Sequence, residues 1–451
     1  MNPGVFREYD IRGMVERDFD NVFVRDVGRA FATLLRRNGG RTIAVGRDCR
    51  LSSDKLFGLL VEGLLAHGID VIDIGLVPTP LLYFTLYKWP VDGGVMITGS
   101  HNDAPYNGFK LALGQTTIYG EKIAELRRII ELQAFEPLTV PGRIRANSII
   151  PEYQDFIMGQ FRFERPLRVA IDAGNGCGGV IAAPLLRQLG VETTELYIEM
   201  DGRFPNHHPD PTIEANMRDL IEAVCGAGLD IGLAYDGDAD RLGAVDETGR
   251  IVWGDELMVA FSRSILNAHP GATIIGEVKC SKRMYDDIAR HGGRPIMWKT
   301  GHSLLKSKLK EEKALLAGEM SGHMFFADRY YGFDDAIYAS FRLLEILSDT
   351  GRGLGAIIGD LEKSHFTPEI RLDCPDDKKF EIVRMAADYF RPSGEVSEID
   401  GVRVNFADGW GLIRASNTQP ALVLRFEAST AARLNEIRSL FEHKLRDFGA
   451  V

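Results

Sequence analysis

The hydrophobic and polar positions of the chain repeat at long range, and the repeat predicts one series of elements three times. Each series opens with an apolar run of strand length, and these runs are Arg41–Asp48, Leu167–Gly174 and Ala272–Lys279. A helical segment follows and ends near a glycine, which suits a helix C-terminus, at Gly68, Gly190 and Gly292. A second short strand then begins, at Ile69–Ile74, Val191–Leu196 and Arg294–Trp298. Strands that alternate with helices at this spacing indicate parallel βαβ units with right-handed crossovers.

The third strand of each series ends in a polar loop that contains glycine. These strands are Gly94–Ile97, Leu229–Tyr235 and Ala314–Ala317, and the loops are Thr98–Asn102, Asp236–Arg241 and Gly318–His323. A hairpin-like pair and an amphipathic helix come next, with the helices at Glu121–Leu132, Asp255–Leu266 and Asp335–Leu347. We therefore expect three sister α/β domains with mixed sheets. Each would contribute the loop after its third strand to a shared site in a central cleft.

The C-terminal part breaks this repeat. A helix is predicted around Lys379–Phe390, strands near Val402–Phe406, Gly411–Arg414 and Ala421–Phe426, and a closing helix from Thr430. This order favours a smaller α+β domain. The predicted domains are residues 1–145, 146–252, 253–366 and 367–451, with linkers expected at Phe135–Pro151 and near Ser364–Pro375.

Composition narrows the possible partners and the compartment. The 451 residues include 53 Lys plus Arg and 64 Asp plus Glu, a formal charge of −11, which indicates neither nucleic acid nor an anionic membrane as a partner. No apolar run approaches the about 18 residues of a membrane span, and the N-terminus does not resemble a signal peptide. The five cysteines are widely spaced without a C-x-x-C pair, which argues against a disulfide framework or a zinc site and favours a reducing cytoplasm.

The run Val95–Asn102 predicts a buried strand that ends in a small polar loop with Ser100 at its apex. Its hydroxyl would lie at the carboxyl end of a strand, where open α/β sheets bind their ligands. Taken alone, the loop has an alternative interpretation, because Ser, Thr and Asn are also the usual residues that cap the next element.

Asp236, Asp238 and Asp240 alternate directly after an apolar strand, an arrangement that can turn three carboxylates toward one point. That suits a hard divalent cation. The spacing also matches an EF-hand loop in part, but Arg241 stands where that loop needs glycine, and the flanks are predicted strands. Three carboxylates would leave ligand positions open for water or a phosphate oxygen, which is typical of Mg²⁺ in phosphoryl transfer. The alternative is a solvated aspartate turn.

Two further loops offer polar groups for a sugar phosphate. Glu319, Ser321 and His323 can hydrogen-bond vicinal sugar hydroxyls, although a helix cap explains this loop equally well. The run Arg414–Pro420 combines a guanidinium with hydroxyl and amide groups, which suits a phosphate, although a plain turn is as common. There is no Walker-type phosphate loop and no dinucleotide-type glycine spacing, so nucleotide use is not supported.

The loops TGSHN, DGDADR, GEMSGH and RASNTQP, in this order, resemble the four signature loops of the α-D-phosphohexomutase family. The resemblance covers the whole chain. It implies that Ser100 is phosphorylated in the active enzyme and that Asp236, Asp238 and Asp240 hold Mg²⁺ beside that phosphate, with Ser100 as a further ligand. It also implies that the loop with Glu319, Ser321 and His323 grips sugar hydroxyls.

The resemblance extends to other residues. In family members the RASNTQP-like loop binds the substrate's own phosphate, which implies this role for Arg414, Ser416, Asn417 and Thr418. The runs FREYDIRG and Lys299–Ser303 also resemble family segments. A larger group of site residues is thereby implied: Tyr9, Arg12, Lys110, Arg241, Lys279 and His302.

The family resemblance implies an isomerase that moves a phosphoryl group between the 1- and 6-positions of a hexose phosphate. Phosphoserine at Ser100 would donate its phosphoryl group, with Mg²⁺ and Arg241 offsetting charge, and a hexose 1,6-bisphosphate would form and turn end for end. A fourth domain that closes and reopens the cleft would permit this turn. We assign proton transfer to His101 and Lys110.

Met320 within GEMSGH resembles mannose and glucose mutases, whereas glucosamine mutases resemble one another with Gln at this position. The sugar is therefore expected to be mannose or glucose, and phosphoglucosamine mutase is the alternative within the class. From another class, the alternative is a non-catalytic sugar-phosphate or metal-binding protein. The sequence does not indicate an oligomeric state.

Overall fold

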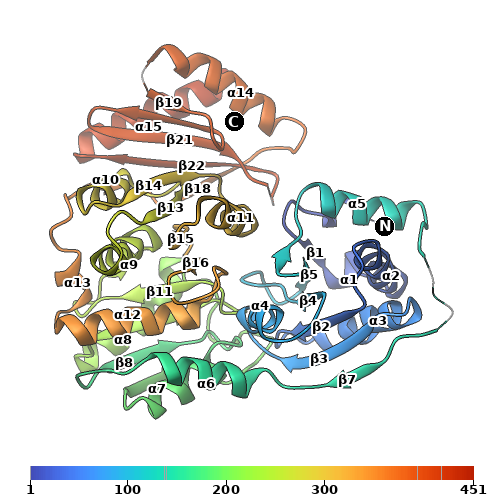
Figure 1. The fold of residues 1–451 in the computed structure, drawn as a ribbon. Coiled ribbons are helices and arrows are strands. Elements are labelled where there is room, and N and C mark those ends of the chain that lie inside the picture. The colour runs from blue at the N-terminus through green and yellow to red at the C-terminus, as the bar shows by residue number, and fades with distance from the viewer. Residues whose placement is uncertain (1, 137, 139, 394, 418, 451) are drawn as a thin grey trace.

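The structure is a computed structural model that describes all residues except 1, 137, 139, 394, 418 and 451. Figure 1 shows the first domain in blue at the right, the second and third in green to orange at the left, and the C-terminal domain in orange-red at the top. The described residues form sheets of seven, five, four and six strands. Three sister α/β domains with mixed sheets and an α+β C-terminal domain are thus confirmed. None of the helices in the described residues is both long and apolar enough to span a bilayer.

The first domain has the strand order β1-β5-β4-β2-β3-β7, with β6 paired to β5. Its elements are η1 Pro3–Val5, β1 Ile11–Met14, α1 Val15–Asp18, α2 Asn21–Arg37, β2 Thr42–Arg47, α3 Ser53–Ala66, β3 Asp70–Leu76, α4 Thr79–Lys88, β4 Gly93–Ile97, β5 Tyr106–Leu113, β6 Thr116–Thr117, α5 Glu121–Glu131 and β7 Ile144–Ala146. Strand β2 pairs in parallel with β3 and β4, and β4 pairs antiparallel with β5. The turn after β2 and the Ser100 loop after β4 therefore lie at one edge of the sheet.

The second domain repeats this arrangement in the order β12-β11-β10-β8-β9. Its elements are α6 Ile150–Gln160, β8 Arg168–Asp172, α7 Gly179–Gln188, β9 Glu192–Leu196, η2 Glu214–Met217, α8 Arg218–Ala227, β10 Ile231–Tyr235, β11 Leu242–Val245 and β12 Ile251–Val252. Strand β10 is parallel to β8 and antiparallel to β11, as β4 is to β2 and β5. The aspartate loop that follows β10 is therefore the counterpart of the Ser100 loop.

The third domain has the order β14-β13-β15-β16. Its elements are α9 Gly254–Ala268, β13 Thr273–Glu277, α10 Lys282–Arg290, β14 Arg294–Trp298, α11 His302–Glu312, β15 Leu316–Gly318, β16 Met324–Phe326, α12 Ala336–Thr350 and α13 Leu354–Ile357. Helix α12 begins after Asp335, whose carboxylate accepts the Tyr338 N–H, and is followed by Gly351 with a φ of 65°. Both are ordinary helix signals, which is why the sequence predicted this helix closely.

The C-terminal domain has the order β17-β22-β21-β20-β19, with β18 also paired to β22. Its elements are β17 His365–Phe366, β18 Ile370–Asp373, α14 Lys379–Phe390, η3 Arg391–Ser393, β19 Glu395–Ser397, β20 Val402–Phe406, β21 Gly409–Ala415, β22 Ala421–Ala428 and α15 Ala431–Asp447. The sheet is antiparallel throughout.

The segments predicted as linkers contain short strands, so they are more regular than the sequence indicated. Strand β7 lies in the first and pairs with β3, while β17 and β18 lie in the second and pair with β22. These are edge strands with exposed positions. Because a neighbouring strand supplies their hydrogen bonds, their own sequence carries little apolar signal.

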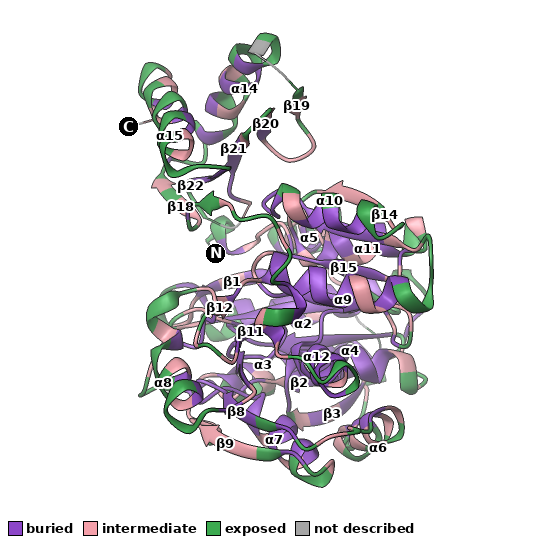
Figure 2. Ribbon diagram, turned by 90° about the vertical axis from the view of Figure 1, so that its left-hand side faces the viewer, coloured by how far each residue is buried: buried purple, intermediate pink, exposed green. Residues whose placement is uncertain are grey.

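The apolar cores show which domains belong together. One cluster fills the first domain, and a larger one runs from α4 and α6 through the second and third domains. The C-terminal domain has a separate cluster built from its sheet, α14 and α15. In Figure 2 the outer faces of α14 and α15 are exposed, and β21 in the sheet between them and the third domain is buried. The first three domains are thus joined by apolar packing, whereas the fourth meets the third at a small separate cluster of Val278, Trp410 and Leu412.

Candidate active site

The Ser100 loop presents its hydroxyl to the second domain. Ser100 has a φ of 50°, which is unusual for a residue other than glycine, and its N–H donates to Thr98 Oγ1 at 2.8 Å. Its Oγ lies 3.1 Å from His101 Nδ1 and donates to Asp236 Oδ2 at 3.2 Å. Burial and the positive charges of Arg241 and Arg12 hold the pKa of His101 well below its ordinary value, so the ring is neutral.

The three aspartates after β10 converge. One carboxylate oxygen of each of Asp236, Asp238 and Asp240 lies within 4.8 Å of the others, and all three residues are buried. Burial, followed by the charges of Asp240 and Asp238, raises the pKa of Asp236 well above its ordinary value. In the described residues, Oδ1 of Asp238 and Oδ1 of Asp240 are buried without a hydrogen-bond donor. Buried carboxylates that repel one another and keep free oxygens fit a hard divalent cation.

Lys110 on β5 places a cation beside these carboxylates. Its Nζ donates to Asp238 Oδ2 at 2.8 Å and also to Asp240 Oδ2. Burial opposes the charge on Lys110, but the two carboxylates outweigh it and raise its pKa well above the ordinary value. Thr79 at the start of α4 donates its hydroxyl to Asp238 Oδ2 as well. The lysine is therefore a fixed positive charge rather than a free base.

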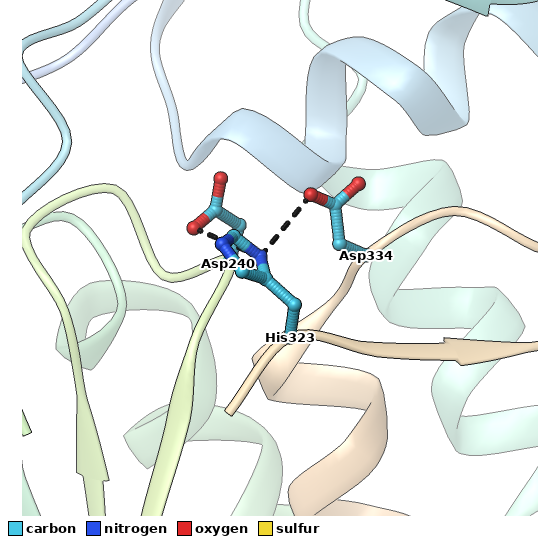
Figure 3. A group of neighbouring side chains, drawn as sticks. All are labelled: Asp240, His323 and Asp334. Carbon is cyan, nitrogen blue, oxygen red and sulfur yellow. Dashed lines mark ion pairs between the residues drawn. The ribbon is translucent and has the colours of Figure 1, made fainter. Parts of the chain in front are cut away.

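His323 lies between two carboxylates (Figure 3). Its Nδ1 is 3.3 Å from Asp334 Oδ2 and 3.6 Å from Asp240 Oδ1, which brings the third domain to the aspartate loop. Its Nε2 accepts a hydrogen bond from Arg241 Nε at 3.1 Å. A carboxylate at Nδ1 sets the tautomer that leaves Nε2 as an acceptor.

Asp334 also contacts two residues of α11. Lys306 Nζ donates to Asp334 Oδ1 at 3.0 Å, and His302 Nδ1 lies 3.8 Å from Asp334 Oδ2. Burial alone would raise the pKa of Asp334, but Lys306 and the two histidines lower it well below the ordinary value. The ring of His302 lies 5.8 Å from the rings of Tyr9 and of His323. The histidines therefore connect the metal side of the site to the N-terminal segment.

In the loop predicted to bind sugar hydroxyls, Glu319 is held by contacts within its own domain. Glu319 Oε1 accepts the Gly301 N–H at 2.8 Å, and Oε2 accepts the Ser321 hydroxyl at 2.9 Å. The Met320 N–H donates to Glu277 Oε1 at 3.3 Å. The Glu319 carboxylate is thus fixed in direction, while each of its oxygens keeps a lone pair for a further donor.

The loop predicted to bind phosphate meets the N-terminal segment. Asn417 Nδ2 donates to the Tyr9 hydroxyl at 2.9 Å, and that hydroxyl donates to Thr300 O at 2.8 Å. Arg414 Nε donates to Asp400 Oδ2 at 3.0 Å. The hydroxyl of Ser416 accepts the Gln419 N–H at 3.2 Å. Thr418, the remaining predicted residue of this loop, lies outside the described residues.

Two other predicted residues approach the site from opposite sides. Arg12 on β1 donates to Asn102 Oδ1 at 3.0 Å and to Asp10 Oδ2 at 2.6 Å, so it lies against the Ser100 loop. Lys279 after β13 pairs with Glu369 at 2.9 Å and lies 3.7 Å from Glu277. A continuous series of contacts therefore runs from Ser100 to Asn417, and all four domains contribute to it.

Sequence reasoning missed several residues of this series. Asp334 was placed in a hairpin before α12, where its neighbour Asp335 accounts for the helix cap. Lys306 lies one helical turn after His302 on α11, a spacing that could have indicated it. The sequence around Thr79 indicated only the start of a helix. Asp400 followed no predicted strand and had no signal.

Three sister domains and a C-terminal domain around these contacts define the phosphohexomutase class, and comparison with known proteins gives the same result. The family models for the alpha/beta/alpha domains I, II and III of phosphoglucomutase/phosphomannomutase match residues 3–136, 151–249 and 253–364. The model for the C-terminal domain matches residues 369–444.

Relatives match over nearly the full chain. It is 45% identical to a phosphomannomutase/phosphoglucomutase of Pseudomonas putida, covering 98% of this chain and 95% of that protein. It is 46% identical to a phosphoglucomutase of Neisseria gonorrhoeae, covering 97% and 96%. A solved structure of a phosphoglucomutase/phosphomannomutase family protein from Burkholderia thailandensis superposes with a TM-score of 0.93 at 42% identity, covering 100% and 98%. The chain belongs to the phosphoglucomutase/phosphomannomutase family and is an enzyme of the phosphohexomutase class.

Proposed function

We propose that this enzyme moves a phosphoryl group reversibly between the 1- and 6-positions of mannose or glucose phosphates through a phosphoserine at Ser100. One observation carries the proposal. The Ser100 hydroxyl of the first domain donates to Asp236 of the second at 3.2 Å, within a group of three converging carboxylates. A serine beside an oxygen-lined cation site is the arrangement that phosphoryl transfer requires.

Asp236, Asp238 and Asp240 would hold Mg²⁺, with an oxygen at Ser100 as a further ligand. The buried Oδ1 atoms of Asp238 and Asp240, which lack a donor among the described residues, support this assignment. The bound cation supplies positive charge that offsets the charge on the transferring phosphoryl oxygens.

The protein's own cations would share this task. Arg241 Nε lies 4.0 Å from Asp236 Oδ2, close to the Ser100 hydroxyl, and Arg12 lies on the other side of the same loop. Lys110 remains charged between two carboxylates, so we now assign it an electrostatic role in place of proton transfer. A bound or transferring phosphoryl group would be surrounded by donors fixed before it arrives.

Proton transfer is assigned to imidazoles. His101 Nδ1, 3.1 Å from Ser100 Oγ, is placed to hold or return the serine proton. His323 is oriented by Asp334 at 3.3 Å and carries an acceptor at Nε2, which suits removal of a proton from a sugar hydroxyl. Arg241 now occupies that acceptor and would have to turn toward the phosphoryl group.

The loop at Arg414, Ser416, Asn417 and Thr418 would bind the phosphate that is not transferred. Because a hexose 1,6-bisphosphate must turn end for end, this loop has to accept either end of the sugar. The separate core of the C-terminal domain supports a cleft that opens and closes as that domain moves.

The sugar is assigned from hydroxyl contacts and from relatives. Glu319, Ser321, His323 and His302 would face hydroxyls, with Tyr9 and Lys279 completing the cleft. Relatives named for mannose and glucose phosphates support these sugars over glucosamine phosphate. We also retain the cytoplasm as the location, on the cysteine usage of the sequence.

The test is a phosphate that maps to Ser100. Incubation with glucose 1,6-bisphosphate and Mg²⁺ should add one phosphate to the intact protein, and Ser100→Ala should take up none and lose turnover. Full turnover by Ser100→Ala would refute the mechanism. Rates on mannose 1-phosphate, glucose 1-phosphate and glucosamine 6-phosphate then decide the sugar, and no turnover on any of them would favour a binding protein.

A further inference from the structure

Arg50, in the turn between β2 and α3, is a buried residue that the mechanism above does not use. Its side chain is 0% exposed although it carries a full charge. Strand β2 pairs in parallel with β4, with Arg47 opposite Ile97, so this turn lies beside the Ser100 loop. The Asp48 N–H bonds to Ile97 O at 2.9 Å, which joins the turn to the last residue of β4.

The guanidinium of Arg50 binds the carbonyl oxygens of the Ser100 loop. Nη2 donates to Ser100 O at 2.8 Å and to Asn102 O at 2.5 Å. Nη1 donates to Asp103 O at 2.6 Å and to Tyr106 O at 2.9 Å. Nε donates to Asp48 Oδ2 at 3.2 Å, so every N–H of the guanidinium is used.

Asp48, two residues before Arg50, also binds the Ser100 loop. Its Oδ2 accepts the Gly99 N–H at 3.1 Å, and its Oδ1 accepts the Ser53 hydroxyl at 2.6 Å and the Arg50 N–H at 3.1 Å. The loop is thus held at N–H groups by Asp48 and at carbonyls by Arg50. No lysine could replace this arrangement, because one ammonium has three donors without a planar fork.

The backbone of the loop is shaped to this guanidinium. A Cβ at Gly99 would lie 2.4 Å from Arg50 Cζ, so only glycine allows the close approach. Ser100 has a φ of 50°, a conformation that persists only where surrounding contacts impose it. The hydrogen bond from Arg50 to Ser100 O fixes the peptide group between Ser100 and His101.

The second domain lies against the same turn. The ring of Phe204 is 5.1 Å from Arg50 Cζ, and a Cβ at Gly202 would meet Cys49 O at 2.4 Å. Arg50 therefore lies where the serine loop and the domain of the aspartate loop meet.

We propose that Arg50 is a positioning residue for phosphoryl transfer, which holds Ser100 in one orientation toward the Asp236 group through the carbonyls of its loop. The inference rests on the proposed role of Ser100. Transfer depends on an in-line approach of the reacting atoms, and a misplacement of about 1 Å can reduce such a rate about a hundredfold. Because Arg50 touches neither substrate nor metal, its loss should affect the rate of transfer more than substrate binding.

The test compares Arg50→Lys with Arg47→Lys. Arg47 is the matched control, because it ends strand β2 and forms ion pairs with Asp54 at 2.6 Å and Asp73 at 2.8 Å. Within the described residues, its side chain donates no hydrogen bond to the Ser100 loop. Arg50→Lys should lower kcat and the rate of phosphate uptake at Ser100 from glucose 1,6-bisphosphate by about tenfold to a hundredfold, with KM nearly unchanged. Arg47→Lys should leave both rates close to those of the wild type.

Gly99→Ala gives an independent perturbation, since its methyl group must displace the Arg50 guanidinium. If Arg50 acts through the loop, the double variant Gly99→Ala/Arg50→Lys should lose little more rate than either single variant. In addition, the ³¹P resonance of the phosphoserine should broaden or split in Arg50→Lys and stay single in Arg47→Lys.

The proposal is overturned if Arg50→Lys transfers phosphate at the wild-type rate, if its loss appears in KM alone, or if Arg47→Lys loses as much. It is also overturned if the fold-losses in rate of the two single variants multiply in the double variant. Failure of the proposed function would differ, because the wild-type protein itself would then take up no phosphate at Ser100.

Discussion

Two neighbouring aspartates show how much a single position decides. Asp334 points toward His323 and Lys306, while Asp335 caps α12 and accepts the hydroxyls of Tyr153 at 2.9 Å and Tyr330 at 2.7 Å. Burial is the largest influence on both carboxyl groups. It raises the pKa of Asp335 to about 6, whereas nearby cations lower the pKa of Asp334. The first residue therefore belongs to the site, and the second to the packing beneath it.

The raised pKa of Asp335 predicts a pH dependence of stability. A carboxyl group whose folded pKa of about 6 exceeds its ordinary 3.8 contributes stability below 3.8 that is lost as the pH rises through 6. The loss is on the order of 3 kcal/mol for this fully buried group. Melting temperatures of Asp335→Asn and wild type, measured from about pH 4 to about pH 7, should diverge in favour of the variant as the pH rises.

Thr430→Ala is the control for that measurement. It removes the hydroxyl that caps α15, which accepts the Arg433 N–H at 3.2 Å, without removing a titratable group. Its deficit of about 1 kcal/mol should stay constant over the same pH range. A constant difference for Asp335→Asn as well would show that folding does not raise the pKa of the Asp335 carboxyl group.

Among the elements, α2 and α3 show why glycine occurs inside helices of the first domain. A Cβ at Gly28 would lie 2.3 Å from Leu60 O, and one at Gly63 would lie 2.2 Å from Arg25 O. The two glycines thus allow the helix backbones to touch. This packing supports β2 from outside, and β2 leads into the turn that holds the Ser100 loop.

Gly63→Ala should therefore destabilise the first domain by about 1 to 3 kcal/mol, the usual range for overpacking, or by more because the obstacle is backbone. Gly58→Ala, in the same helix, has no atom within 4 Å of the added methyl group. It should stabilise the protein by up to about 1 kcal/mol, since alanine is the better helix former. Thermal unfolding measures both, and equal effects would contradict the close contact of α2 with α3.

At the scale of the whole molecule, the C-terminal domain is joined to the third by buried polar groups around a small apolar cluster of Val278, Trp410 and Leu412. Arg425 Nη1 donates to Asp255 Oδ2 at 3.0 Å, and Arg403 Nη1 donates to Val278 O at 2.6 Å and Cys280 O at 2.7 Å. Arg403 also stacks on Trp410, with 3.7 Å from Cζ to the ring centre. These contacts hold the backbone on both sides of Lys279, so the position of that site residue depends on how the last domain docks.

Arg425→Met should uncouple this domain. Removing one partner of a buried ion pair typically costs about 3 to 5 kcal/mol, because Asp255 keeps its charge without its cation. Differential scanning calorimetry should then resolve a separate, lower transition for the C-terminal domain. Arg433→Met breaks exposed pairs with Asp408 and Glu436 in the same domain and should change the profile by less than about 1 kcal/mol. One unchanged transition in Arg425→Met would contradict this coupling.

The sequence by itself determined the order of elements and the fold class. Strand β14 and helix α14 begin and end where the pattern predicts, because apolar periodicity and capping residues act within a few positions of the chain. The family resemblance predicted the class of enzyme, which the comparisons confirm. The domain boundaries and the roles of the site residues remain predictions.

Only the tertiary structure decided which groups meet. Edge strands β7, β17 and β18 form because partners far away in the chain supply their hydrogen bonds, and no local pattern records this. The contacts of Asp334 and Arg50 also depend on partners that are distant in the chain. A buried carboxylate or guanidinium is costly unless specific partners surround it, and those partners come from other loops and domains. The repeat in the sequence predicted the loops, and packing of the domains determined what each loop faces.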